Sequence, residues 1–244
     1  HGRYPPEPRG RALVERVLAR GTGQIVAVSQ ALSQYLVEFL SLEASPMVIR
    51  NGIDLTQFGG GLAGGSRAAL RETLGYGSDD VVGVIVARLT PVKNHAGLLR
   101  AFSMARREVP RLRLLIVGSG PLEDDLKALA GDLGQAEHIS FAGFRSDVHR
   151  FLAAADFSVL SSLTEGLPLS VLEAMASGLP VVSPSVGGIP DALGQPPAGL
   201  LFPVGDEERL ASALVRIGSD SGLRSELGCL ALSRRFDVDE MSDV

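Results

Sequence analysis

Two carboxylates spaced eight positions apart, Glu165 and Glu173, are the side chains whose surroundings suggest chemistry most directly. Glu165 falls in a polar turn, whereas Glu173 falls within the apolar helical pattern VLEAMA. They could be two surface glutamates, but this helix is too apolar to face solvent. A carboxylate inside it needs hydrogen-bonding partners, and sugar hydroxyl groups are suitable ones. The position of Glu173 therefore favours contact with both hydroxyls of a ribose.

A helix start lies between the two carboxylates. Pro168 suits the first turn, because its missing N–H group would have no intrahelical partner there. The next residues, Leu169 and Ser170, offer free backbone N–H groups at the positive end of the helix dipole. Phosphate groups bind at such helix starts. A ribose on Glu173 with its phosphates on these amides would belong to a nucleoside diphosphate.

Two cations, Arg88 and Lys93, lie in a loop over residues 87–99. The loop follows an apolar run typical of a central strand in a parallel sheet. Because the two cations sit in a loop rather than on one helix face, they could converge on a diphosphate, Arg88 as a forked donor and Lys93 as a point charge. The alternative is a pair of solvated surface charges.

A G-x-G turn at Gly118 and Gly120 resembles part of a dinucleotide-binding motif, but Glu123 stands where a third glycine is expected. No acidic residue ends a following strand in the usual way for a ribose contact. The turn chemistry favours a tight turn into a helix over direct contact with a cofactor. An NAD-dependent oxidoreductase remains an alternative. The nearby Asp124 and Asp125 fall within the helical pattern and do not form a metal-binding loop.

The elements that must position these groups alternate between strand and helix. Apolar runs predict strands, and helical patterns lie between them, so the class is α/β with a doubly wound parallel sheet. Ligands bind such a sheet at the carboxyl ends of its strands. The predicted strands are 24–28, 46–49, 81–87, 112–118, 138–143, 156–162, 180–183 and 199–202, and the predicted helices are 11–20, 29–39, 67–74, 95–108, 121–133, 146–154, 168–177 and from 206 onward.

Composition limits the function classes. The chain has 244 residues, 45% of them hydrophobic, and no apolar run of the roughly 20 residues needed to span a bilayer. A net charge of −5 with interspersed signs argues against nucleic acid as a partner. The single cysteine, Cys229, excludes an internal disulfide and favours a reducing, cytoplasmic location. The chain begins at His1 rather than Met and stops within a helical pattern at 239–241, so we expect a piece of a longer protein.

Six blocks in order, together with VSQAL at 28–32, resemble the retaining glycosyltransferases of family 4, the group 1 enzymes of GT-B architecture. The E-x7-E spacing from Glu165 to Glu173 resembles the signature of this family. Ala87 stands where the family usually has glycine, which loosens the prediction for the phosphate loop. The blocks are VIRNGIDLTQF at 48–58, VARLTPVKN at 86–94, LLIVGSGPLEDDL at 114–126, ISFAGFRSDV at 139–148, EGLPLSVLEAMASGLPVV at 165–182 and VGGIPD at 186–191.

The resemblance implies roles for individual residues. Arg88 and Lys93 would hold the donor diphosphate, Glu173 the ribose, and Glu165 the donor sugar, either as a nucleophile or as a hydrogen-bonding group. Gly166, Leu169 and Ser170 would line the donor site, and Phe144 and Arg145 would lie near the base. His1 would be a donor-contacting histidine of the N-terminal domain. No metal site is implied, and the donor would be a UDP or GDP sugar rather than a separate cofactor.

The resemblance also implies a domain division. Residues 1–56 would be the remnant of a second α/β domain that binds the acceptor, 57–78 a linker, and 79–244 a Rossmann-like nucleotide-sugar-binding domain with a truncated C-terminal crossover helix. The implied activity is a metal-independent, retaining hexosyltransferase that is inactive as this piece alone. The acceptor would be a glycan, a lipid or a small molecule, with possible peripheral membrane association through the N-terminal domain. A non-catalytic nucleotide-sugar-binding module remains an alternative.

Overall fold

The computed structural model describes residues 21–22, 24–58 and 64–234. His1, the predicted helix at 11–20 and the helical pattern at 239–241 lie outside these ranges. The elements of the first part are β1 (Val26–Ala27), α2 (Gln30–Leu40), β2 (Met47–Val48) and the 3-10 turn η1 (Leu55–Gln57). The two strands pair in parallel, with Val26 opposite Met47. Ser29 caps α2, because its hydroxyl accepts a hydrogen bond from the backbone N–H of Leu32 at 3.1 Å.

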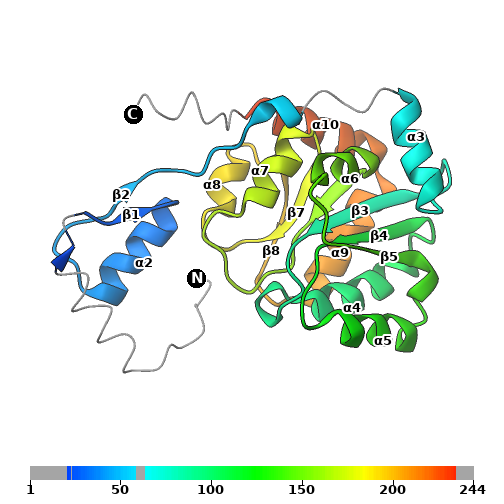
Figure 1. The fold of residues 1–244 in the computed structure, drawn as a ribbon, viewed down its shortest axis with the longest axis horizontal. Helices are drawn as coiled ribbons and strands as arrows, with labels where there is room; N and C mark the ends of the chain where they lie inside the picture. The colour runs from blue at the N-terminus through cyan, green and yellow to red at the C-terminus, as the bar shows by residue number, and fades with distance from the viewer. Residues whose placement is uncertain (1–20, 23, 59–63, 235–244) are drawn as a thin grey trace.

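A six-stranded parallel sheet forms the second part, in the order β5-β4-β3-β6-β7-β8 (Figure 1). This is the α/β, doubly wound class that the sequence predicts. The strands are β3 (Val81–Val86), β4 (Leu112–Val117), β5 (Ile139–Gly143), β6 (Phe157–Val159), β7 (Val181–Pro184) and β8 (Gly199–Phe202). The helices and 3-10 turns are α3 (Gly64–Thr73), η2 (Pro91–Lys93), α4 (His95–Arg106), α5 (Glu123–Asp132), η3 (Ala136–His138), α6 (Val148–Ala154), α7 (Leu169–Ala176), α8 (Ile189–Leu193), α9 (Glu207–Ser219) and α10 (Ser221–Leu232).

Helices cover both faces of the sheet, α4, α5 and α9 on one side and α6, α7 and α8 on the other (Figure 1). Strand β3 shows why its sequence is apolar throughout, since successive side chains of a strand point to opposite faces. Val81 and Ile85 join the core beneath α4 and α9, whereas Val82 and Val84 join the core beneath α6 and α7. A strand covered on both faces needs apolar residues at every position.

Helix α3 is fixed to the amino end of the sheet by charge pairs. The guanidinium of Arg71, which is 7% exposed, lies 3.2 Å from the carboxylate of Asp156. The same carboxylate accepts a hydrogen bond of 2.7 Å from the backbone N–H of Val82. Much of the predicted linker 57–78 is therefore an anchored helix, while the domain boundaries themselves stay a prediction.

Two local predictions differ from the structure. The sequence indicates only a turn at Gly187 and Gly188, but the helix α8 follows directly, with Pro190 in its first turn where proline is tolerated. Pro168 is not the first residue of α7 but its N-cap, with extended backbone (φ −73°, ψ 129°). The helix therefore starts at Leu169.

Candidate functional site

The candidate site lies where the chain reverses its direction of travel across the sheet. From β3 the chain moves outward through β4 and β5, then returns to form β6 on the other side of β3. Strands β3 and β6 are therefore neighbours at a topological switch point, the place where ligands bind sheets of this class. The loop after β3 carries Arg88 and Lys93, and the loop after β6 carries Glu165.

These two loops are joined by three contacts. The Ser161 hydroxyl donates to the carbonyl of Lys93 at 2.8 Å, and the backbone N–H of Leu163 donates to the carbonyl of Val92 at 2.8 Å. Lys93 Nζ lies 2.5 Å from Glu165 Oε1, with side-chain exposures of 21% and 9%. The structure thus brings two predicted site residues into one ion pair, which the sequence did not anticipate.

Arg88 follows β3 directly and is exposed to solvent. Within residues 21–22, 24–58 and 64–234, its guanidinium has no hydrogen bond or ion pair. This exposed position fits both interpretations of Arg88: a solvated surface charge, or a cation available to an incoming anion.

The start of α7 lies at the end of the β6 loop. Val171 N–H donates to the carbonyl of Pro168 at 3.1 Å, so the amides of Leu169 and Ser170 precede the first helical hydrogen bond. The Leu169 side chain is 48% exposed, so this end of the helix reaches the surface. Gly166 precedes the helix and accepts a hydrogen bond of 2.6 Å from the backbone N–H of Gly188.

Glu173 sits one turn into α7 between fully buried side chains, among them Leu172 and Ala174. It is half-buried, so its carboxylate is partly shielded from solvent. Its carboxylate makes no hydrogen bond or ion pair with the part of the chain that the structure describes. Burial raises the pKa of Glu173 above its ordinary value of 4.5. A half-buried carboxylate without a protein partner is a group that a ligand could satisfy.

This burial predicts a pH-dependent effect of Glu173→Gln. With its pKa raised in the folded state, Glu173 is protonated more readily in the folded chain than in the unfolded chain. Ionisation of Glu173 therefore lowers the free energy of unfolding as the pH rises through that pKa. We expect Glu173→Gln to raise the melting temperature of the ligand-free chain at pH 7, and to leave it unchanged below pH 4.5, where glutamate is protonated in both states.

Thermal unfolding across pH 4 to 8 would measure this effect. Glu226→Gln is the matched control, because Glu226 is exposed on α10 and its replacement should change the melting temperature little. A melting temperature of Glu173→Gln equal to or below that of the unmodified chain at pH 7 would contradict the desolvation of this carboxylate.

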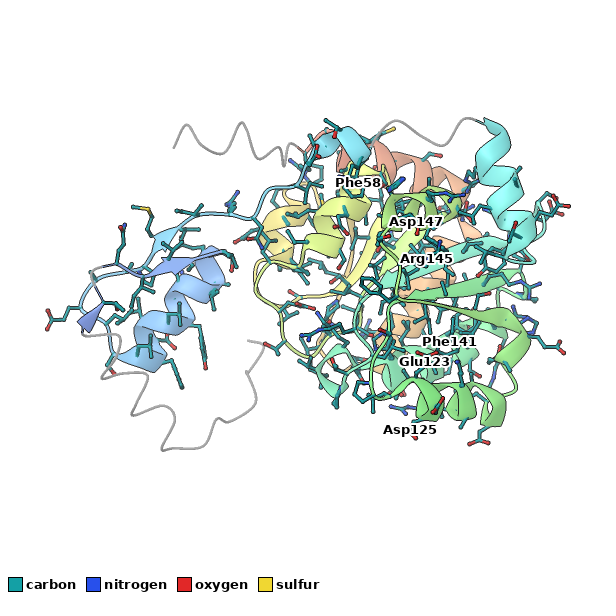
Figure 2. All side chains as sticks on the ribbon, viewed as in Figure 1. Phe58, Glu123, Asp125, Phe141, Arg145 and Asp147 are labelled. Atoms are coloured by element: carbon teal, nitrogen blue, oxygen red, sulfur yellow. The ribbon has the colours of Figure 1, made fainter. Side chains whose placement is uncertain are left out.

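Phe144 and Arg145 follow β5. Phe144 is 77% exposed. Arg145 donates to both carboxylate oxygens of Asp147 at 2.9 and 3.0 Å, and its guanidinium lies 4.9 Å from the ring centre of Phe151 (Figure 2). Phe144 is therefore accessible to a flat base, whereas Arg145 is already held by its own neighbours.

The G-x-G turn supports the loop after β3. Gly118 has φ +143°, and a Cβ atom added to it would lie 2.0 Å from the carbonyl oxygen of Ala87. A Cβ atom on Gly120 would lie 2.4 Å from the carbonyl oxygen of Leu89. The two glycines thus let the backbone of this turn pack against the start of the loop that carries Arg88. The tight turn agrees with the prediction from the sequence. Its packing against the loop after β3 was not predicted.

The sequence analysis also missed His95, which follows Lys93 by two positions and is 1% exposed. Its two ring nitrogens have no hydrogen-bond partner among the described residues. Burial, reinforced by the charge of Lys93, lowers the pKa of His95 to about 4. His95 is therefore neutral at pH 7 and adds no charge to the site. Its place in the run VKNH gave no signal for burial.

The described residues contain no group of three or more His, Cys, Asp or Glu side chains placed to hold a metal ion. Within the same ranges, no helix is both long enough and apolar enough to cross a membrane.

The fold and these loops define a class of protein. Residues 66–231 match the family model of the group 1 glycosyl transferases, and the chain belongs to this family.

Individual relatives and solved structures agree. The chain is 33% identical to a D-inositol 3-phosphate glycosyltransferase of Saccharomonospora viridis, over 98% of this chain and 58% of that protein. It is 34% identical to EpsD of Bacillus subtilis, over 72% of this chain and 48% of that protein. It thus spans about half the length of these relatives. The structure of Anabaena HepE in complex with UDP and glucose superposes with a TM-score of 0.85 and 26% identity, over 95% of this chain and 64% of that one.

Proposed function

We propose that this chain carries the donor-binding part of a retaining hexosyltransferase that uses a UDP-linked sugar. The observation that carries the proposal is Glu173, a half-buried carboxylate with no hydrogen bond or ion pair to the described residues, one turn from the amides of Leu169 and Ser170 at the helix start. A ribose offers two neighbouring hydroxyl donors, which a carboxylate accepts. The solved HepE structures with UDP and with UDP-glucose, similar to this chain at TM-scores of 0.84 and 0.86, support uridine over guanosine.

The transfer step requires charge neutralisation more than bond-making by the protein. The bond between the anomeric carbon and the diphosphate oxygen breaks and UDP leaves with the bonding electrons. The acceptor hydroxyl oxygen bonds to the anomeric carbon on the same face, and its proton passes to the departing diphosphate oxygen. Arg88, Lys93 and the amides of Leu169 and Ser170 would stabilise the departing diphosphate. These groups supply the charge that a metal ion would otherwise provide, so the proposal includes no obligatory metal.

Glu165 has a narrower role in this proposal. The ion pair with Lys93 already neutralises much of the charge of Glu165. A carboxylate that attacks the reacting carbon needs that charge to be available. We therefore assign Glu165 to hydrogen-bonding the donor sugar rather than to attacking it. Phe144 would stack on the base, since it is exposed after β5.

The acceptor and the setting are parts of the same proposal. The acceptor would be a glycan, a lipid or a small molecule bound by the N-terminal side of the whole protein, which could also make a peripheral membrane contact. Of that side, the described part of this chain includes two short strands and the helix α2. We expect the chain alone to bind donor and to turn over little. The single cysteine supports a cytoplasmic location.

The experiment is isothermal titration calorimetry of the chain against UDP, GDP, ADP and NAD. We expect UDP to bind with a dissociation constant between about 1 μM and 1 mM, more tightly than the other three. Glu173→Ala should weaken UDP binding about tenfold, because a charged hydrogen-bond acceptor is lost. Glu226→Ala, on the exposed face of α10, is the control. Tighter binding of NAD than of UDP, or no effect of Glu173→Ala, would contradict the proposal.

A further inference from the structure

One hydrogen bond connects the N-terminal part of the chain to the loop before α7. Asn51 Nδ2 donates to the carbonyl oxygen of Leu167 at 2.9 Å, across 116 positions of sequence. Asn51 follows β2, and Leu167 is 7% exposed between the loop after β6 and the N-cap of α7. The bond therefore acts on the peptide that leads directly into the helix start.

The start of α7 has little of its own to hold it in place. Its N-cap is Pro168, which makes no side-chain capping hydrogen bond and has no backbone N–H to donate. The orientation of the peptide between Leu167 and Pro168 sets the direction in which the helix begins. The Asn51 amide fixes this peptide from outside the loop, and with it the direction of the amides of Leu169 and Ser170.

The residues after Asn51 extend this contact along the helix. Ile53 is 6% exposed and belongs to one apolar cluster with Leu167 and Leu172, against which Phe58 also packs (Figure 2). Leu172 lies in α7 next to Glu173. The segment 51–58 therefore packs on the helix that carries Glu173.

The opposite side of the loop is held by backbone contacts. Gly188 N–H donates to the carbonyl of Gly166 at 2.6 Å. A Cβ atom on Gly187 would lie 2.1 Å from the carbonyl oxygen of Glu165, so the two backbones touch. The loop 165–168 is thus held between the turn before α8 and the segment 51–58. Of these two supports, only the second comes from the N-terminal part of the chain.

We propose that Asn51 is a positioning residue for the donor: it orients the 165–168 loop so that the amides at the start of α7 face the diphosphate. This inference rests on the proposed function for the identity of the ligand, but not for the orientation of the loop. Donor affinity then depends on how the N-terminal part docks on α7. Movement of the N-terminal part would therefore change binding of the phosphates more than binding of the ribose, because Asn51 bonds to the loop and not to Glu173.

The test compares Asn51→Ala and Asn51→Asp in the full chain. Asn51→Ala removes the amide group that donates to the Leu167 carbonyl. We expect UDP to bind about fivefold more weakly, which is the effect of one hydrogen bond. Asn51→Asp places an acceptor against the Leu167 carbonyl and should weaken UDP binding further. Uridine, which lacks phosphates, should lose no affinity in either variant. A merely structural role would lower the melting temperature without changing the ratio of the UDP and uridine affinities.

Asp54→Ala is the matched control in the same segment. Its carboxylate is exposed, and among the described residues it accepts hydrogen bonds from Thr56 and Gln57, including the backbone N–H of Thr56 at 2.9 Å. Asp54→Ala should leave UDP affinity unchanged. Equal UDP affinity of Asn51→Ala and the unmodified chain would overturn the proposal.

A second readout separates this inference from the proposed function. In ligand-free chain, Asn51→Ala should shift the amide NMR signals of Leu169 and Ser170, whereas Asp54→Ala should not. If the unmodified chain binds no UDP, the proposed function fails, and these amide signals alone decide the role of Asn51. Unchanged signals of both amides in Asn51→Ala would overturn it.

Discussion

Lys93→Met is expected to weaken UDP binding by about 30- to 100-fold, since a charge-assisted hydrogen bond to phosphate is lost and Glu165 loses the cation of its ion pair. Lys93 is the cation that the structure places against Glu165, at 2.5 Å, in the loop after β3. Removing the Lys93 charge places the diphosphate near a Glu165 carboxylate that no longer has the Lys93 cation beside it. Calorimetry with UDP would measure the lost phosphate bond and the repulsion by Glu165 together, as one change in the dissociation constant.

A double variant separates the two parts. The double variant with Lys93→Met and Glu165→Gln also removes the repulsive carboxylate. It should therefore bind UDP more tightly than the single variant Lys93→Met does. Glu165→Gln alone should not weaken UDP binding, because UDP carries no donor sugar and the Lys93 charge remains for the diphosphate. Lys127→Met is the control, because Lys127 pairs with Glu123 on the surface of α5. If the double variant binds no better than Lys93→Met, the two residues do not act as a pair.

Gly118→Ala is expected to lower the free energy of unfolding by about 3 kcal/mol, through backbone strain and a steric clash together. The residue has φ +143°, which side-chain-bearing residues rarely adopt, and its added Cβ would lie 2.0 Å from the Ala87 carbonyl oxygen. Both atoms involved are close to the backbone, so no flexible side chain can move aside. Urea denaturation would measure the loss.

Gly131→Ala is the matched control for this substitution. Gly131 lies in α5 with nothing within 4 Å of an added Cβ, so alanine should stabilise the helix by about 0.5–1 kcal/mol. Where Gly118→Ala remains folded, it should also weaken UDP binding, because the loop that begins at Ala87 is displaced. A stable Gly118→Ala variant with full UDP affinity would contradict the supporting role of the turn.

The sheet could be predicted from the sequence because its signal is local. An unbroken apolar run such as that of β3 is required of any strand covered on both faces, so the residues themselves report it. Helix α8 was missed for the corresponding reason. Its five residues follow two glycines and include a proline, and a helix this short is maintained by packing of Ile189 and Leu193 rather than by its own pattern.

The candidate site was predictable in its parts and not in its pairings. Glu173 carries a local signal, since an acidic residue stands in an apolar helix. The ion pair of Lys93 with Glu165 and the hydrogen bond from Asn51 to Leu167 join residues far apart in sequence. The ion pair depends on the strand order that places β3 beside β6, and the Asn51 bond depends on how the segment after β2 packs on α7; neither is encoded in the local pattern of residues.

The central claim is that a nucleoside diphosphate binds between the loop after β3 and the start of α7. The most direct measurement is a titration of the chain with UDP followed by the backbone amide signals in ¹H–¹⁵N NMR. The account predicts the largest shifts at Leu169, Ser170 and residues 88–94, saturating together at one dissociation constant. Saturable shifts confined to another part of the sheet, or no shifts at millimolar UDP, would contradict it.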